Sequence, residues 1–262
     1  MSQDARWPSR AFIEEEAHGR MEPEMRLLLQ GLHAKGIPTE CFTAKRMERR
    51  QLPLTPDTLV AGYVPTVLGA LKQLGIEPPP TNDYPPSLTP FLHRRLWTST
   101  VRQLNAHLLD VASPPVFAKP QGRRKRFTGR VFQNASDLLY LERASQGTPL
   151  ICSEVVRWLS EYRVFVVHGR PVGTRHYAGD VTVSLDEARV HEALGLLESS
   201  GEATAGYSVD FGVLSTGETA LVEWNDGFSL GAYGLEAEPY TALTIARWCE
   251  LTGLSQPRPP ST

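Results

Sequence analysis

The apolar positions of the first 75 residues alternate between helical and extended spacing. Apolar side chains three and four positions apart predict a helix over residues 23–36 and a second helix over residues 62–74. Short apolar runs predict strands at residues 37–43 and 58–61, and Phe12 with Ile13 predicts an edge strand. This alternation of helices and strands favours an α/β lobe with a small, mainly parallel sheet.

The next segment, residues 78–90, is dense in proline. It predicts a surface connector without regular structure, which brings Asp83 and Tyr84 to a defined place. Apolar side chains at helical spacing then predict a third helix over residues 92–108. The arginines of this segment, among them Arg94, lie off its apolar side. A solvated face is the favoured interpretation for them, and a site for an anionic substrate is the alternative.

Short strands dominate the remainder of the chain. Strands are expected at residues 115–120, 130–132, 149–156, 161–167 and 171–177, and helices at residues 135–143, 185–200 and 238–251. The most basic run, QGRRKR at residues 121–126, lies between the first two of these strands. A basic loop with a glycine in this place suits the phosphates of a nucleotide, and a solvated hairpin is the alternative.

Residues 206–235 are predicted to form two short strands followed by a glycine-rich loop. Asp210 lies in the first strand. Glu223 and Asn225 are two positions apart in the second strand and therefore project to one face. If the two strands pair in register, Asp210 lies beside Glu223. Two carboxylates and an amide oxygen form an oxygen-only cluster that suits Mg²⁺ shared with substrate phosphates. Ordinary turn formation before Asp226 is the alternative.

Net charge and the cysteine positions indicate which binding partners and which cellular compartment to expect. The chain has 262 residues and a formal net charge of −2, so no excess of positive charge points to nucleic acid or to an anionic membrane. Cys41, Cys152 and Cys249 are far apart in the sequence, which predicts reduced thiols. We find neither a secretion signal nor an apolar run of about 18 residues. We therefore expect a cytoplasmic protein with no nucleic-acid and no membrane partner.

Six motifs follow one another between residues 113 and 250. They are Phe117-Ala118-Lys119-Pro120, a basic glycine loop from Lys125 to Gly129, Glu154-Val155-Val156, Glu161, Asp210-Phe211 and Glu223-Trp224-Asn225. This order resembles the ATP-grasp superfamily. More narrowly, Glu161-Tyr162-Arg163 and the loop from Asn225 to Gly231 are similar to the clade of that superfamily named for one arginine and two lysines.

The resemblance implies a fold class and a division into domains. The expected class is α/β (α+β), with an ATP-grasp fold in which two α+β subdomains sandwich ATP after a small α/β lobe. We expect that lobe and its proline-rich connector at residues 1–112. The two ATP-grasp subdomains are expected at residues 113–160 and 161–252, and a disordered tail at residues 253–262.

The resemblance also implies roles for individual residues. ATP would be contacted by the side chains of Lys119 and Lys125 at its phosphates, the backbone of Glu154, Val155 and Val156 at its adenine, and Glu161 at its ribose. Asp210, Glu223 and Asn225 would hold one or two Mg²⁺ ions. The expected catalytic residues are Arg163, Arg175 and Lys125, of which the arginines would stabilise charge on the transferred phosphoryl group or on the acyl phosphate.

Two positions depart from the family pattern. Ser208 and Val209 stand where many relatives have an arginine before the metal-binding aspartate, so we assign that arginine's role to Arg163. Asp226 stands where many ligases have a small residue, which implies that the acceptor side of the site differs from that of amino-acid ligases.

The function implied by the resemblance is an ATP- and Mg²⁺-dependent ligase that joins a carboxylate to an amine through an acyl phosphate. Its substrates would be small molecules or peptides, and a homodimer is the oligomer to consider because dimers are the commonest. One alternative is a kinase of the same fold that phosphorylates a hydroxyl group. The other is a nucleotide-binding module without catalysis.

Overall fold

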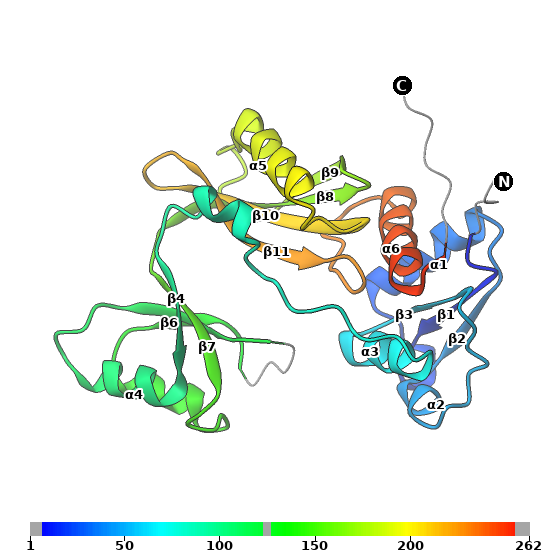
Figure 1. Cartoon of the computed structure of the whole chain (residues 1–262), viewed down its shortest axis with the longest axis horizontal. Coiled ribbons are helices and arrows are strands. Elements are labelled where there is room, and N and C mark those ends of the chain that lie inside the picture. The colour runs from blue at the N-terminus through cyan, green and yellow to red at the C-terminus, as the bar shows by residue number, and fades with distance from the viewer. Residues whose placement is uncertain (1–6, 123–126, 255–262) are drawn as a thin grey trace.

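The computed structural model describes residues 7–122 and 127–254, which form three lobes with one sheet each (Figure 1). The first lobe has three parallel strands in the order β2-β1-β3: β1 (Arg10–Glu14), β2 (Thr39–Phe42) and β3 (Thr58–Ala61). Its helices are α1 (Pro23–Ala34), α2 (Ala44–Glu48), α3 (Val64–Gln73) and the 3₁₀ helix η1 (Ala17–Gly19). The predicted parallel sheet is confirmed.

The edge position predicted for Phe12 and Ile13 is wrong. β1 is the central strand of its sheet, and both side chains are fully buried. Charged residues on both sides of this short apolar run suggested an edge strand. Its place is decided instead by pairing with two strands that come later in the chain, as is usual for a buried strand in a parallel sheet.

The second lobe contains an antiparallel sheet in the order β4-β7-β5-β6. Its strands are β4 (Leu96–Thr100), β5 (Val116–Pro120), β6 (Arg130–Phe132) and β7 (Pro149–Glu154), and its helices are α4 (Val101–Leu109) and the 3₁₀ helix η3 (Ala135–Leu141). Val101 and Leu104 of α4 share a core with β5 and β7. Both β4 and α4 therefore belong to this lobe, although they precede residue 113, where we expected the lobe to begin.

The helix predicted over residues 92–108 is wrong in its first half. Residues 96–100 form β4 because they pair with β7, with Leu96 opposite Ser153. The aromatic and β-branched side chains of this segment also favour extended backbone. α4 begins only at Val101, where the Thr100 hydroxyl accepts a hydrogen bond from Gln103 N at 3.3 Å and caps the helix.

The proline-dense connector is partly regular, which corrects our expectation for residues 78–90. Pro86–Phe91 forms the 3₁₀ helix η2, and it buries Leu88 and Phe91 against the third lobe. Proline at the first helical position is tolerated because its missing N–H would have no partner within the helix. The connector therefore runs along the third lobe before the chain enters the second lobe.

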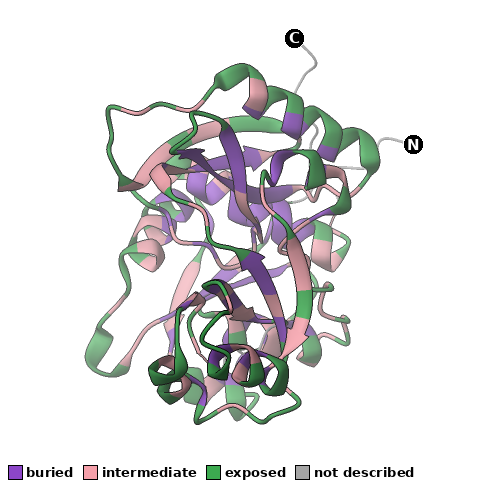
Figure 2. Cartoon of the chain, turned by 90° about the vertical axis from the view of Figure 1, so that its left-hand side faces the viewer, coloured by how far each residue is buried: buried purple, intermediate pink, exposed green. Residues whose placement is uncertain are grey.

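The third lobe contains an antiparallel sheet in the order β11-β10-β8-β9. Its strands are β8 (Trp158–Val167), β9 (Arg170–Gly179), β10 (Gly206–Leu214) and β11 (Thr219–Asp226). The helix α5 (Glu187–Ser200) lies over buried strands of this sheet with its outer side exposed (Figure 2). The predicted hairpin and its register are confirmed, since Asp210 pairs with Glu223. Of the predicted tail, residues 255–262 lie outside the described residues.

The closing helix, α6 (Ala237–Thr252), joins the third lobe to the first. It lies beside α1 and reaches β10 and β8 (Figure 1). One hydrophobic core runs from β1, β2 and β3 through α6 to residues 230–235, whereas the second lobe has a core of its own. None of the helices within residues 7–122 and 127–254 combines the length and apolarity needed to cross a membrane.

Candidate active site

A cleft of about 1400 Å³ lies between the second and third lobes. Its walls include the connector, the β5–β6 hairpin, the crossing from β7 to β8, and the end of β11 with the loop that follows. The predicted site residues that line it are Lys119, Glu154, Val155, Val156, Glu161, Glu223 and Asn225. Most of the motifs that are spread along the sequence thus meet at one cavity.

Lys119 reaches into this cleft from β5. Side chains alternate along this strand, so Ala118 packs in the core while Lys119 points to the other face. Its Nζ atom lies 2.8 Å from Glu223 Oε2 and 2.8 Å from Asp83 Oδ2, and 4.5 Å from the centre of the Tyr84 ring. Burial alone would lower the pKa of Lys119, but Glu223, Tyr84 and Asp83 together raise it above its ordinary value. The ammonium group therefore stays charged.

Asp210 lies behind Glu223 and Asn225. It is 2% exposed, and both of its carboxylate oxygens accept hydrogen bonds from Arg163, at 2.7 Å each. Asn225 Nδ2 also donates to Asp210 Oδ2 at 3.4 Å. Burial raises the pKa of Asp210, and the Arg163 charge only partly offsets this effect. The three predicted metal ligands are therefore neighbours on one face of the β10–β11 hairpin.

The donor chemistry of these three residues fits Mg²⁺. Two carboxylates and one amide offer only hard oxygen ligands, and Mg²⁺ takes few protein ligands when phosphates and water supply the others. In the parts of the chain that the structure describes, no group of three Asp, Glu, His or Cys side chains is arranged to hold a metal ion. A site built from Glu223, Asn225 and Asp210 would therefore depend on the nucleotide phosphates for its remaining ligands.

The two predicted catalytic arginines both bind the glycine-rich loop. The Arg163 guanidinium lies 4.7 Å from the centre of the Tyr233 ring, and its Nη1 atom donates to Gly231 O at 3.5 Å. Arg175 is opposite Arg163 on β9, and its Nε atom donates to Gly234 O at 2.9 Å. In this structure both guanidinium groups hold the loop, and Arg163 also holds Asp210. Their roles toward a phosphoryl group stay predictions.

Glu161 points into the cleft near the metal-ligand candidates. The Tyr177 hydroxyl donates to Glu161 Oε2 at 3.1 Å. Burial raises the pKa of Glu161, the Tyr177 hydrogen bond lowers it, and the nearby charges of Asp210 and Glu223 raise it again. Glu161 therefore faces the same part of the cleft as those two carboxylates. Its role at the ribose stays a prediction.

The crossing between the second and third lobes forms another wall of the cleft. Glu154 is exposed at the end of β7, where its backbone N–H donates to Arg95 O at 3.1 Å and its Oε2 atom accepts from Arg95 N at 3.0 Å. Val155 and Val156 follow and line the cleft. Lys125 lies outside the described residues, but Gly122 and Phe127, on either side of its loop, also line the cleft.

Arg94 is a cleft residue that the sequence reasoning placed wrongly. We favoured a solvated helix face, but Arg94 lies before β4, lines the cleft and donates to the backbone oxygens of Leu221 and Val222. Its guanidinium also lies 5.3 Å from the centre of the Trp158 ring. Burial lowers the pKa of Arg94. The alternative interpretation, in which the arginines of this segment form a site for an anionic substrate, was the only signal that pointed toward the cleft.

A second, smaller cavity of about 190 Å³ adjoins the cleft at the first lobe and shares Tyr63, Ser229 and Leu230 with it. It is lined by four carboxylates and no lysine or arginine from the described part of the chain; the carboxylates are Glu14, Glu16, Glu22 and Glu24. The Tyr63 hydroxyl donates to Glu22 Oε1 at 2.9 Å, a bond that raises the pKa of Tyr63 to about 12. Glu16 also forms an ion pair with Arg20, which lies outside this lining. The cavity is therefore acidic mainly through Glu14, Glu22 and Glu24.

Comparison with known proteins identifies structures with the same fold. Similar solved structures include a D-alanine–D-alanine ligase from Bacillus anthracis, with 13% identity, 93% of this chain and 97% of that chain covered, and a TM-score of 0.55. An N5-carboxyaminoimidazole synthetase from Staphylococcus aureus has 10% identity, coverage of 96% and 79%, and a TM-score of 0.57. The macrocyclase MdnC from Microcystis aeruginosa, bound with the precursor peptide MdnA, has 12% identity, coverage of 93% and 99%, and a TM-score of 0.54.

Identities of this size establish a shared fold, and no curated protein matches the chain. The model of an ATP-grasp domain family, the second family of the clade named for one arginine and two lysines, matches residues 91–243, which is more than half of the chain. The predicted ATP-grasp fold is confirmed. Two of the similar solved structures are a ligase and a synthetase by name, and an ATP-dependent ligase is the enzyme class that we expected. The chain belongs to the ATP-grasp superfamily, in family 2 of the clade named for one arginine and two lysines.

Proposed function

We propose that this protein is an ATP- and Mg²⁺-dependent ligase that joins a carboxylate to an amine through an acyl phosphate. The observation that carries the proposal is the pairing of Lys119 with Glu223 across the cleft, at 2.8 Å. The charged ammonium group of Lys119 in the second lobe thus contacts Glu223, a candidate metal ligand in the third lobe. That is where the phosphates of a nucleotide bound between the lobes would lie.

The nucleotide would lie along the cleft with its adenine at residues 154–156 and its ribose near Glu161. Lys119, together with Lys125 from the basic loop, would bind the phosphates as point charges. Asp210, Glu223 and Asn225 would hold Mg²⁺, which, when bound, would neutralise phosphate charge and orient the terminal phosphoryl group. Arg163 would keep the Asp210 carboxylate ionised and oriented, as its two hydrogen bonds to that carboxylate support.

The reaction proceeds in two displacements. A carboxylate oxygen of the substrate attacks the γ-phosphorus of ATP, the bond to the β–γ bridging oxygen breaks, and ADP leaves. The amine nitrogen then attacks the acyl carbon, phosphate leaves, and the nitrogen loses a proton to give the amide. In both steps negative charge develops near Lys119, so a fixed ammonium there lowers both barriers.

The acidic cavity beside the cleft supports an amine as the second substrate. Glu14 is largely buried, and its Oε2 atom accepts a hydrogen bond from Tyr63 N at 2.8 Å, which fixes this carboxylate at the cavity wall. Glu16 is paired with Arg20, and the carboxylates of Glu14, Glu22 and Glu24 would attract a protonated amine. One structural neighbour was solved with a precursor peptide and another is named for joining D-alanine, so we propose both small-molecule and peptide substrates. A cytoplasmic location and a homodimer are further proposals.

Thermal unfolding with and without Mg²⁺ and ATP tests the nucleotide site. We expect a Mg²⁺-dependent rise in melting temperature for the wild type that Lys119→Ala loses, since a ligand at about one hundred times its Kd stabilises the native state by about 2.7 kcal/mol. Lys72→Ala, at an exposed position on α3, is the matched control and should keep the rise. No rise in the wild type at millimolar ATP would contradict the proposal.

ADP release then separates the three candidate activities. A ligase releases ADP only when both a carboxylate and an amine are present, and forms an amide. A kinase needs only a hydroxyl-bearing acceptor and forms no amide. A binding module shows the melting shift but releases no ADP with any substrate pair.

A further inference from the structure

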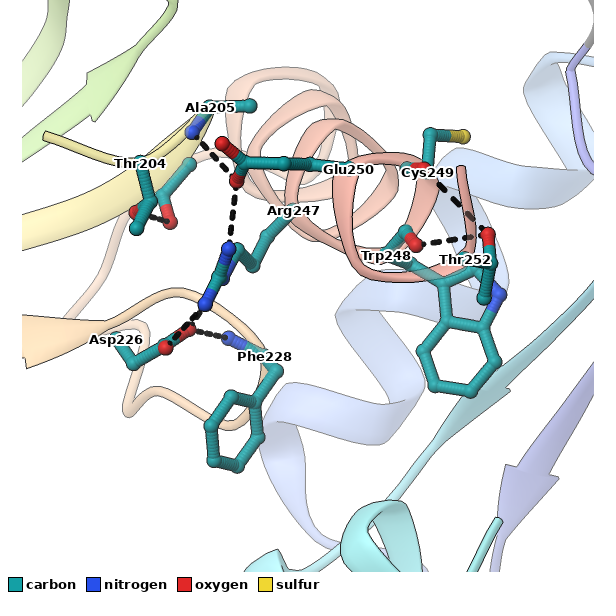
Figure 3. A network of polar contacts seen from close by, with 10 residues as sticks. Thr204, Ala205, Asp226, Phe228, Arg247, Trp248, Cys249, Glu250 and Thr252 are labelled. Carbon is teal, nitrogen blue, oxygen red and sulfur yellow. Dashed lines mark hydrogen bonds and ion pairs between the residues drawn. The ribbon is translucent and has the colours of Figure 1, made fainter. Parts of the chain in front are cut away.

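Arg247 binds two carboxylates at the point where β11 ends (Figure 3). Its Nε and Nη2 atoms donate to Asp226 Oδ1 and Oδ2 at 2.7 and 2.6 Å, and its Nη1 atom donates to Glu250 Oε2 at 2.6 Å. Arg247 is 5% exposed. A buried guanidinium that meets a carboxylate through two parallel hydrogen bonds fixes the orientation of that carboxylate. The end of β11 is thus tied to α6.

Because the Asp226 carboxylate is fixed by Arg247, the residues on both sides of Asp226 are also restricted in position. It directly follows Asn225, and its Oδ1 atom also accepts a hydrogen bond from Phe228 N at 3.3 Å. Gly227 N donates to Gly206 O at 3.1 Å, and a Cβ atom at Gly227 would lie 2.1 Å from the same oxygen. The turn therefore packs closely against the first residue of β10. The positions of Asn225 and of the cleft wall at residues 228–230 depend on Asp226.

The helix that carries Arg247 is itself anchored to the third lobe. Glu250 Oε2 accepts a hydrogen bond from Ala205 N at 2.8 Å as well as from Arg247, so α6 holds the residue before β10 and the last residue of β11 together (Figure 3). The Tyr240 hydroxyl donates to Leu230 O at 2.7 Å. The same helix thus supports both the end of the hairpin and the loop between the two cavities.

We propose that Arg247 is a positioning residue: through Asp226 it holds Asn225 and residues 227–230 in the arrangement that Mg²⁺ and the nucleotide phosphates require. This inference rests on the proposed function. It also accounts for the carboxylate that departs from the family pattern, because the Asp226 side chain accepts two hydrogen bonds from Arg247. A pair that merely attaches α6 to the sheet would stabilise the fold and leave the requirement for Mg²⁺ unchanged.

The test compares Arg247→Gln and Asp226→Asn with Glu250→Gln, which alters the other partner of the same guanidinium. For each variant, the Mg²⁺ concentration that gives half of the ATP-dependent melting shift is measured, and the same midpoint is measured for ADP release. We expect Arg247→Gln and Asp226→Asn to raise both midpoints by about tenfold, as loss of a supporting residue around a metal site does, and Glu250→Gln to change them by less than about twofold.

Two outcomes overturn the proposal. One is an equal Mg²⁺ midpoint in the wild type, Arg247→Gln and Glu250→Gln, with a lower ligand-free melting temperature in both variants. If Arg247→Gln does not fold, Arg247→Lys, which keeps the charge and loses the two-pronged contact, is judged by the same midpoint. A wild type without any Mg²⁺-dependent shift overturns the proposed function itself, and the positioning role with it.

Discussion

Lys119 Nζ lies 2.8 Å from Glu223 Oε2, so an ion pair joins the second lobe to the third across the cleft. The same ammonium group lies 2.8 Å from Asp83 Oδ2 of the connector. Three segments that are far apart in the sequence therefore meet at one cation. Because a nucleotide phosphate would bind the same ammonium, it must compete with two carboxylates for Lys119.

We predict that Asp83→Asn binds ATP more tightly than the wild type. The substitution removes one of the carboxylates that compete for Lys119, and a partly exposed ion pair is worth up to about 1 kcal/mol, which corresponds to about a fivefold change in Kd. Isothermal titration calorimetry measures this Kd. Glu77→Gln, which removes an exposed charge just before the connector, is the control and should leave Kd unchanged. Weaker binding by Asp83→Asn would mean that Asp83 supports the nucleotide site.

We predict that Glu223→Gln abolishes turnover and leaves the fold intact. The amide has nearly the same shape as the carboxylate but carries no charge for Mg²⁺ or for Lys119, so kcat should fall by at least about 100-fold. The Glu223 side chain is 33% exposed, so the melting temperature should change little. ADP release and thermal unfolding measure the two effects. Glu218→Gln, in the exposed turn of the same hairpin, serves as the control. Wild-type activity in Glu223→Gln would remove the metal assignment.

We predict that Asp210→Asn destabilises the protein by about 3 kcal/mol, because it leaves the buried Arg163 guanidinium without its counter-charge. Urea denaturation measures this change in the free energy of unfolding. Arg175→Gln should cost only about 1 kcal/mol, because the Arg175 guanidinium donates to the neutral backbone oxygens of Thr174 and Gly234. Equal losses in the two variants would show that the Arg163–Asp210 ion pair contributes no more to the free energy of unfolding than hydrogen bonds to backbone oxygens do.

We predict that Tyr177→Phe moves the acid limb of the pH–activity profile to higher pH. Burial raises the pKa of Glu161, and the Tyr177 hydrogen bond opposes this rise. Without the hydroxyl the pKa of Glu161 rises further, so at a given acidic pH a larger fraction of Glu161 is protonated. The protonated form has no negative charge and accepts hydrogen bonds from the substrate more weakly. ADP release measured from about pH 5 to about pH 8 follows this shift.

The same raised pKa of Glu161 predicts how the free energy of unfolding changes with pH in Tyr177→Phe. The pKa of Glu161 in the folded protein lies above its value in the unfolded chain, so the folded state holds the extra proton between the two values and stability falls as pH rises through that interval. Tyr177→Phe widens the interval.

Tyr162→Phe is the control for the pH–activity profile. Its lost hydroxyl donates to the backbone oxygens of Val181 and Val183, so the acid limb should stay at the pH of the wild type. Coincident profiles of Tyr177→Phe and the wild type would contradict the prediction.

The β10–β11 hairpin could be predicted from the sequence because its evidence is local. A strand repeats every two residues, so Glu223 and Asn225 had to share a face, and a short turn left few registers that bring Asp210 beside them. The parallel sheet of the first lobe was predictable for a similar reason. Its helices and strands alternate over short distances, and each has its own apolar period.

The contacts of Asp83 and Arg94 could not be predicted, because no periodic pattern surrounds them. Asp83 reaches Lys119 through a connector whose prolines define its stiffness but not its direction. β4 was mistaken for a helix because Leu92 and Leu96 are four positions apart, as are Leu104 and Leu108 later in the same segment. Its strand conformation comes from pairing with β7, which lies far later in the chain and which local propensity does not report.

The continuity of the hydrophobic core has a mechanical consequence. The first lobe and α6 share one core, whereas the second lobe packs around its own apolar residues and is joined to the rest by two crossing segments, at residues 92–95 and 154–157. The first lobe and the third lobe are therefore held together by a core that continues through α6, which also includes Phe165 of β8. A movement of the second lobe away from the third would have to break the ion pair between Lys119 and Glu223.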